Sequence, residues 1–140
     1  MRTLFFPYYH TPMGFNEVFP PTDIIKPYEF EKDVIIKGYT ISVSTFSDTH
    51  VQAVLSKKFL DWKEVVPPNT EIDKDNVFGG LNSHGADNIT VMFDNNLILL
   101  EKGKKDALHI KVWAHNMDIL SLFGLKRDFH MFVIIYYEEL

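Results

Sequence analysis

The sequence predicts an all-β protein, an antiparallel two-sheet sandwich of the jelly-roll type. Seven or eight short strand-like segments of similar length, turn residues between them and little helical periodicity favour this class. The most informative segment is residues 129–140, a strand that is apolar on both faces. One face carries Phe129, Met131, Val133, Ile135 and Tyr137, and the other carries Phe132, Ile134 and Tyr136. Because such a strand must be covered on both sides, it predicts a further interface.

Composition sets the class of protein more than its activity. At 140 residues the chain has the length of one domain, and its 14% aromatic content suits a sandwich core and protein interfaces. The net charge is −5 and no stretch clusters Lys or Arg, which argues against direct binding of nucleic acid. There is no cysteine, so disulfides and thiolate metal sites are excluded.

The first 32 residues differ from the rest of the chain. They hold five of the seven prolines, which disfavour central strands and helix interiors. We therefore expect an extended arm over 1–32, rich in Pro and aromatics, with a short strand at 4–8, and a single sandwich domain over 33–140. The arm's rings are expected to lie on the domain or on a neighbouring subunit. No secretory signal and no run of about 20 apolar residues is visible. The expectation is a protein made in the host cytoplasm with no leader, no transmembrane segment and no membrane insertion.

The segments after the arm alternate with period two. Residues 33–44 predict a strand with Ile35, Tyr39, Ile41 and Val43 on its buried face. Residues 50–56 predict its neighbour, with Val51, Ala53 and Leu55 inward. Residues 59–66 fit a strand or one helical turn. Residues 67–88 predict a long loop, in which Gly79, Gly80 and Gly85 are turn residues.

The second half begins with a hairpin signal. Residues 88–93 and 97–102 flank Asp94-Asn95-Asn96, a favourable tight-turn sequence. Residues 107–115 then alternate, and residues 117–125 fit a short helix or an apolar loop ended by Gly124. The buried face of 107–115 is expected to carry Leu108, Ile110, Val112 and Ala114.

No motif identifies a reaction. His84 lies in the predicted loop near Asp73, Asp75, Asn76 and Asp87, but EF-hand spacing is absent and the pattern of cupin metal sites is not supplied. No Gly-x-Ser-x-Gly elbow occurs, and the glycines lack the context of a phosphate loop. The sequence therefore predicts a protein that is not an enzyme, with no catalytic residue, no metal ligand and no cofactor. A cupin-like metalloenzyme is the least favoured alternative.

Trp113 is the residue for which ligand binding competes most seriously with packing. It shares the polar side of its strand with His109, Lys111 and His115. An exposed Trp among polar groups is typical of a sugar-stacking or protein-anchoring site. The open alternatives are a carbohydrate- or receptor-binding module built on these four residues, or a Trp113 that the N-terminal arm covers.

The second half of the chain resembles the small jelly-roll structural proteins of icosahedral viruses and bacteriophages. The resemblance rests on residues 98–112, a strand, a Gly-Lys turn and an alternating strand, and on the bulky closing strand 132–137. Trimeric sandwiches of the tumour-necrosis-factor type end similarly, with the last strand at the subunit contact. The resemblance implies a capsid, vertex, spike or decoration protein of the virion. It also implies a homo-oligomer, a trimer or pentamer, that contacts other particle proteins.

The predicted interface combines the terminal strand, Trp113 and the arm. Its residues are Phe132, Ile134, Tyr136, Trp113, Phe5, Phe6 and Tyr8.

Overall fold

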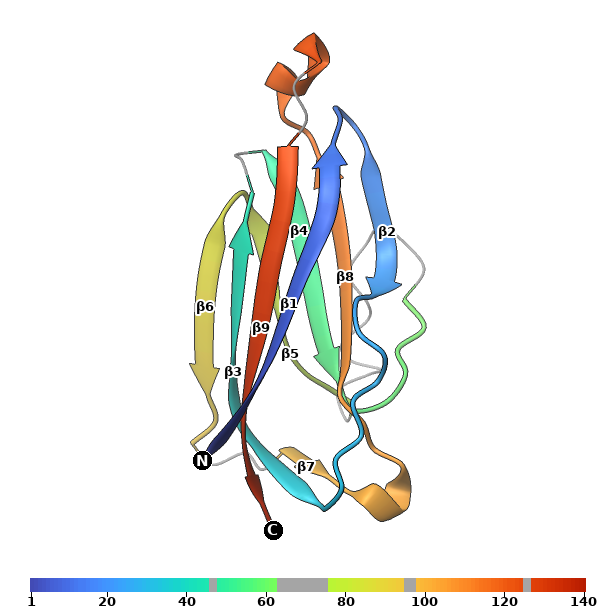
Figure 1. Ribbon diagram of the computed structural model, residues 1–140, viewed down its shortest axis with the longest axis vertical. Coiled ribbons are helices and arrows are strands. Elements are labelled where there is room, and N and C mark those ends of the chain that lie inside the picture. The colour runs from blue at the N-terminus through green and yellow to red at the C-terminus, as the bar shows by residue number, and fades with distance from the viewer. Residues whose placement is uncertain (46–47, 63–75, 95–97, 125–126) are drawn as a thin grey trace.

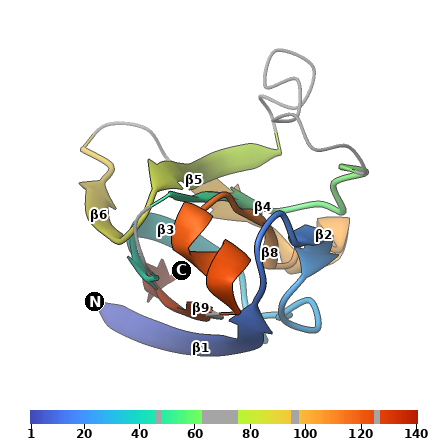
Figure 2. The same ribbon diagram turned by 90° about the horizontal axis from the view of Figure 1, so that it is seen from above.

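The computed structural model describes residues 1–45, 48–62, 76–94, 98–124 and 127–140. Within these ranges all strand pairings are antiparallel and the strands form two sheets packed as a sandwich, which confirms the predicted fold class (Figures 1 and 2). The first sheet has the order β1-β9-β3-β6, with β7 also paired to β3, and the second has the order β2-β8-β4-β5. The strands are β1 (Arg2–Met13), β2 (Val18–Asp23), β3 (Val34–Ser44), β4 (Thr49–Ser56), β5 (Val77–His84), β6 (Asp87–Met92), β7 (Ile98–Leu100), β8 (His109–Asn116) and β9 (Arg127–Glu139). Two short 3-10 helices, η1 (Lys102–Lys104) and η2 (Ile119–Phe123), complete the described chain.

The core lies between the sheets and follows the predicted alternation on three strands. Every second residue of β9 points into it, and so do the predicted inward residues of β4 and those of the 107–115 segment. These side chains are Phe129, Met131, Val133, Ile135 and Tyr137 from β9, Val51, Ala53 and Leu55 from β4, and Leu108, Ile110, Val112 and Ala114 around β8. Local period therefore located most of the core correctly.

A separate N-terminal arm is not confirmed. Residues 2–13 form β1, which pairs with β9, and residues 18–23 form β2, which pairs with β8. Both are edge strands, where a missing N–H is tolerated. Pro20 and Pro21 lie at the irregularity in the β2 register between Phe19 and Thr22. The prolines therefore mark sheet edges and a bulge.

The predicted inward face of β3 is wrong at Ile35. The register of β3 against β9 shifts between Ile36 and Gly38, which is a β-bulge. Val34 and Ile36 are buried before the bulge, whereas Tyr39, Ile41 and Val43 are buried after it. One extra residue reverses the parity, so Ile35 points away from the core.

The predicted loop at 67–88 is wrong for its described part, because β5 occupies residues 77–84. Gly79 and Gly80 lie inside this strand. A Cβ at Gly79 would overlap the ring of Tyr39, and one at Gly80 would overlap the carbonyl oxygen of Ala53. These glycines therefore allow close approach within and between the sheets. Residues 63–75, with the rest of this prediction and most of that for 59–66, lie outside the described residues.

The hairpin predicted around Asp94-Asn95-Asn96 is wrong as well. β6 pairs with β3 over residues 38–43 of that strand, and β7 pairs with β3 over residues 34–36. The two segments thus lie end to end along one partner. The tight connection is at Gly85, with φ of 88°, where β5 of one sheet leads into β6 of the other.

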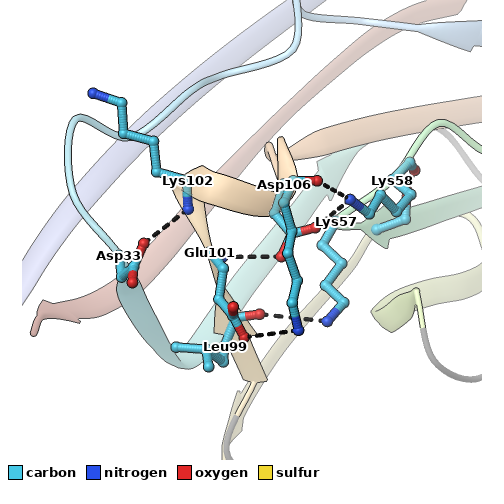
Figure 3. A network of polar contacts seen from close by, with 9 residues as sticks. Asp33, Lys57, Lys58, Leu99, Glu101, Lys102 and Asp106 are labelled. Atoms are coloured by element: carbon cyan, nitrogen blue, oxygen red, sulfur yellow. Dashed lines mark hydrogen bonds and ion pairs between the residues drawn. The ribbon is translucent and has the colours of Figure 1, made fainter.

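A polar network joins the chain around η1 to the segment after β4 and to the start of β3 (Figure 3). The Asp106 carboxylate accepts from the Glu101 N–H at 2.9 Å and lies 2.6 Å from the Lys58 Nζ. Asp33 accepts from the Lys102 N–H at 2.8 Å. Burial alone would raise the pKa of Asp106, but the Glu101 N–H and the Lys58 ammonium outweigh it and lower that pKa.

Asp106→Asn should lower the free energy of unfolding by about 1–3 kcal/mol at neutral pH, because a buried charged acceptor is lost. Because its pKa is lowered in the folded state, the Asp106 carboxylate stabilises the fold fully at pH values above the pKa of an unfolded aspartate, which is about 4. That contribution is lost as the pH falls through the folded-state pKa. The difference between wild type and variant, measured by urea denaturation at neutral pH and at about pH 3, should therefore narrow on acidification. Glu29→Gln, at an exposed carboxylate, is the matched control. An equal loss at both pH values would contradict a role for the charge.

Candidate functional site

The side of the first sheet that faces away from the core is the surface where the apolar terminal strand led us to expect an interface. We call it the outer face. The strand registers place Phe5, Ile134, Thr40 and Thr90 in one row across β1, β9, β3 and β6. The outer face comprises Thr3, Phe5, Pro7 and Tyr9 of β1, His130, Phe132, Ile134 and Tyr136 of β9, Thr40, Ser42 and Ser44 of β3, and Asn88, Thr90 and Met92 of β6.

None of these outer-face side chains belongs to Asp, Glu, Lys or Arg. Charges lie at the ends of the sheet instead, in the pairs Arg2–Glu139 at 2.8 Å and Lys37–Glu138 at 3.7 Å. Asp128, at the start of β9, lies 4.0 Å from the outer-face residue His130. A region without charged residues, enriched in aromatics and bordered by charge, is the composition of the buried centre of a protein interface.

Three hydroxyl groups of the outer face, those of Thr40, Thr90 and Tyr136, are hydrogen-bonded to one another. The Thr40 hydroxyl lies 2.9 Å from that of Tyr136 and 2.8 Å from that of Thr90, in hydrogen bonds where either group can donate. These polar atoms need no partner from water when the surface is covered. Covering these three groups therefore carries a small desolvation cost.

A hollow of about 470 Å³ lies on the outer face. Aromatic rings form part of its wall, with the rings of Phe5 and Phe132 5.4 Å apart and those of Tyr9 and His130 4.6 Å apart. Its other lining residues include Pro7, Ser42 and Ser44. The hollow gives the outer face a concave, largely apolar relief.

The structure separates the residues predicted for the interface. Phe132, Ile134 and Tyr136 share the outer face with Phe5. Phe6 and Tyr8 point to the opposite side of β1 and pack against the core. The ring of Tyr8 lies 6.3 Å from that of Phe129, and burial raises the pKa of its hydroxyl.

Trp113 lies on the other sheet and is 2% exposed. It packs with Val54, Leu60 and Trp62 in a small second cluster. The cover therefore comes from the segment after β4, not from the N-terminal residues. Because a sugar-stacking platform needs an accessible ring, Trp113 offers none in this structure.

Two other residues of the alternative ligand site, Lys111 and His115, are hydrogen-bonded to neighbouring residues. Lys111 donates to the carbonyl of Leu60 at 2.7 Å. His115 Nε2 lies 2.6 Å from Asn16 Oδ1. The pKa of His109 is lowered mainly by burial, and the nearby Lys111 lowers it further. The carboxylate of Asp23 acts in the opposite direction but does not outweigh these effects.

A row of histidines was missed by sequence reasoning. His50 stacks on His84 with 4.3 Å between ring centroids, and it is the register partner of His115 on β8. Nothing in the sequence pairs these positions, because the registers of β4 with β5 and β8 are not local. Among the described residues, no group of three or more His, Asp or Glu side chains is placed to hold a metal ion. Asp73 and Asp75, considered with His84, lie outside those residues.

No helix in the described part of the chain is long and apolar enough to cross a membrane.

The fold and this surface define a β-sandwich with an uncharged, aromatic outer face. No protein-family model matches the chain, and no curated protein matches it. Among solved structures, the chain is similar to one described as "Structure of infectious bursal disease virus Gx strain", with a TM-score of 0.35 and 8% sequence identity. The match covers 96% of this chain and 32% of that chain, so this chain spans about a third of its length. A likeness at this level identifies no family and supports no functional statement.

Proposed function

We propose that this protein is a non-enzymatic structural component of a virus or phage particle that self-assembles through the outer face of its first sheet. The observation that carries the proposal is the uncharged outer face around Phe5, Phe132 and Ile134, with its aromatic hollow. A surface that is depleted of charged residues and enriched in aromatic ones is typical of protein interfaces.

A second copy of this chain is the occupant that the charges favour. The chain carries a net charge of −5, so contacts between charged surfaces of two copies would be repulsive on average. The outer face adds no like-charge pairs at its centre, while the flanking pairs Arg2–Glu139 and Lys37–Glu138 carry both signs. Contact between copies at this face therefore avoids the repulsion that other surfaces would meet.

The virion assignment extends this proposal by the resemblance to jelly-roll particle proteins. Symmetric rings of such domains form when the same contact repeats around an axis. A trimer or pentamer, in contact with other particle proteins, is the arrangement that we propose.

Phe5→Asp should convert the assembled protein to monomer. A carboxylate at the centre of a closed interface is desolvated without a partner, and we expect an increase of about 100-fold or more in the dissociation constant. Light scattering over a concentration series gives the mass, and electron microscopy of the wild type shows whether rings or shells form.

Phe59→Asp is the matched control for this measurement. Phe5 is 59% exposed and Phe59 is 64% exposed, but Phe59 lies away from the first sheet, beside Lys111. The control should retain the wild-type mass. A wild type that stays monomeric at micromolar concentration would contradict the proposal. An equal loss of solution mass in Phe5→Asp and Phe59→Asp would contradict it as well.

A further inference from the structure

One end of the sandwich carries a segment with inverted polarity. Within residues 116–124 the large apolar side chains are exposed and the polar ones are buried. We call the exposed set the apolar tip: Met117 (40% exposed), Ile119 (63%), Leu120 (51%), Leu122 (57%) and Phe123 (80%). Asn116, Asp118 and Ser121 are buried beneath it. Water alone would favour the opposite arrangement.

The exposure is built into a well-defined turn. Asn116 Oδ1 accepts from the Asp118 N–H at 3.0 Å, and Asp118 Oδ1 accepts from the Leu120 N–H at 3.1 Å. Gly124, with φ of 86°, ends η2 in the left-handed conformation that favours glycine. The hydrogen bonds therefore hold the backbone so that the apolar side chains point outward.

The backbone of η2, which carries most of the apolar tip, projects beyond the ends of both sheets, at one end of the long axis of the molecule (Figures 1 and 2). The strands lie behind it and do not flank it. A flat surface can therefore meet the tip without first meeting the rest of the sandwich.

We propose that the apolar tip inserts into the interfacial region of a lipid bilayer. Five partly exposed side chains offer on the order of 500 Å², less than the roughly 800 Å² that each partner contributes to a standard protein interface. A protein partner would also need a pocket shaped to this convex tip. A bilayer needs no complementary shape and accepts each apolar side chain separately.

The charges of the segment fit this occupant. Asp118 is the only ionisable side chain within residues 116–124, and it is buried and engaged by the Leu120 N–H. The apolar tip itself therefore carries no exposed charge toward hydrocarbon. Insertion has to stay shallow, because the exposed Asp48 lies beside the tip, where its backbone carbonyl accepts from the Met117 N–H at 2.8 Å.

An inserting tip revises the expectation of no membrane insertion. That expectation rested on the absence of a run of about 20 apolar residues, which a spanning helix requires. A short exposed tip lies in the membrane–water interface without spanning the bilayer. In the sequence, its few apolar residues cannot be distinguished from residues of a protein core. Only their exposure in the folded protein distinguishes the two cases.

The test is cosedimentation of the full chain with phosphatidylcholine vesicles, with and without phosphatidylserine. The double variant Leu122→Ser, Phe123→Ser should lower the bound fraction by about tenfold or more. Phe59→Ser, at a comparably exposed phenylalanine elsewhere, should leave binding unchanged. In Phe123→Trp, brominated phosphatidylcholine should quench the fluorescence of the new indole, because the indole enters the bilayer. Trp62 and Trp113 are buried in the protein, so the lipid should not quench them.

The inference would be overturned by no binding of the wild type to either vesicle, by equal loss in the tip variant and the Phe59 control, or by no quenching of the new indole in the bound Phe123→Trp variant. A drop in solution mass caused by the tip variant alone would also overturn it, because a second copy would then cover the tip. If binding depends on phosphatidylserine, part of the affinity is electrostatic, and the quenching result still decides insertion. The outer-face variant Phe5→Asp should keep vesicle binding, so this test and that of the proposed function fail independently.

Discussion

Gly80→Ala is expected to lower the free energy of unfolding by about 2–3 kcal/mol, although alanine in the middle of a strand is normally more stable than glycine. The added Cβ would overlap the carbonyl oxygen of Ala53 on the neighbouring strand β4. That oxygen belongs to backbone in the middle of the second sheet, so it cannot swing aside as a side chain would. Urea denaturation measures the loss as a lower midpoint at unchanged slope.

Gly103→Ala is the control for this substitution. Gly103 lies in η1, and no atom outside its chain neighbours lies within 4 Å of a Cβ placed there. Its effect should stay within about 0.5 kcal/mol. If Gly80→Ala were as mild as this control, the close approach of β4 and β5 at Gly80 would not be a constraint on the fold.

The same glycines show what a sequence pattern distinguishes and what it does not. Gly79 and Gly80 were predicted as turn residues. Glycine is typical of turns, but it is also typical of strand positions where another backbone or side chain approaches closely. The register of β4 against β5, which places Gly80 opposite Val54, decides between the two meanings. Likewise, nothing local indicates the bulge near Gly38 that moves Ile35 out of the core. Such features depend on partners far away in the sequence.

The fold class and most of the core were predictable because they depend on local period. Residues 108–114 alternate cleanly, and the structure buries Leu108, Ile110, Val112 and Ala114. Residues 129–137 are apolar on both faces, and the structure buries the face that carries Phe129 and Val133 in the core. The prolines of the first 23 residues were informative too, but they indicate edge strands as readily as an extended arm. Tertiary pairing with β9 and β8 decided the matter in favour of strands.

The candidate interface was predictable only in part. The apolar outward residues of β9 follow from its two-faced pattern. Their neighbours Thr40 and Thr90 look like ordinary polar positions, and the registers that bring them beside Ile134 and Tyr136 are not local. The exposure of Trp113 stayed open in the sequence because its face of the strand also carries His109, Lys111 and His115. Its burial comes from Leu60 and Trp62, which belong to a segment with no clear period.

Asn116→Ala is expected to lower the free energy of unfolding by about 3 kcal/mol, because it removes the centre of a fully buried hydrogen-bond cluster. The Asn116 Nδ2 group donates to the carbonyl of Met13 at 2.9 Å and to Ser121 Oγ at 3.1 Å. Its Oδ1 accepts from the Asp118 N–H at 3.0 Å. One side chain thereby joins the end of β1 to the turn that presents the apolar tip, and its loss leaves several buried groups without their partner.

The loss should be local as well as global, and hydrogen exchange can show this. The backbone pairing of Asn116 with Asn16 and Glu17, at 2.7 and 3.0 Å, does not involve the side chain and should persist. The amides of Asp118 and Leu120 should therefore lose protection more than those of β8. Asn82→Ala, at an exposed amide whose Oδ1 lies 2.7 Å from His50 Nε2, should change stability by less than about 1 kcal/mol. Equal losses at Asn82 and Asn116, or unchanged exchange at Asp118, would show that the turn does not depend on the Asn116 side chain.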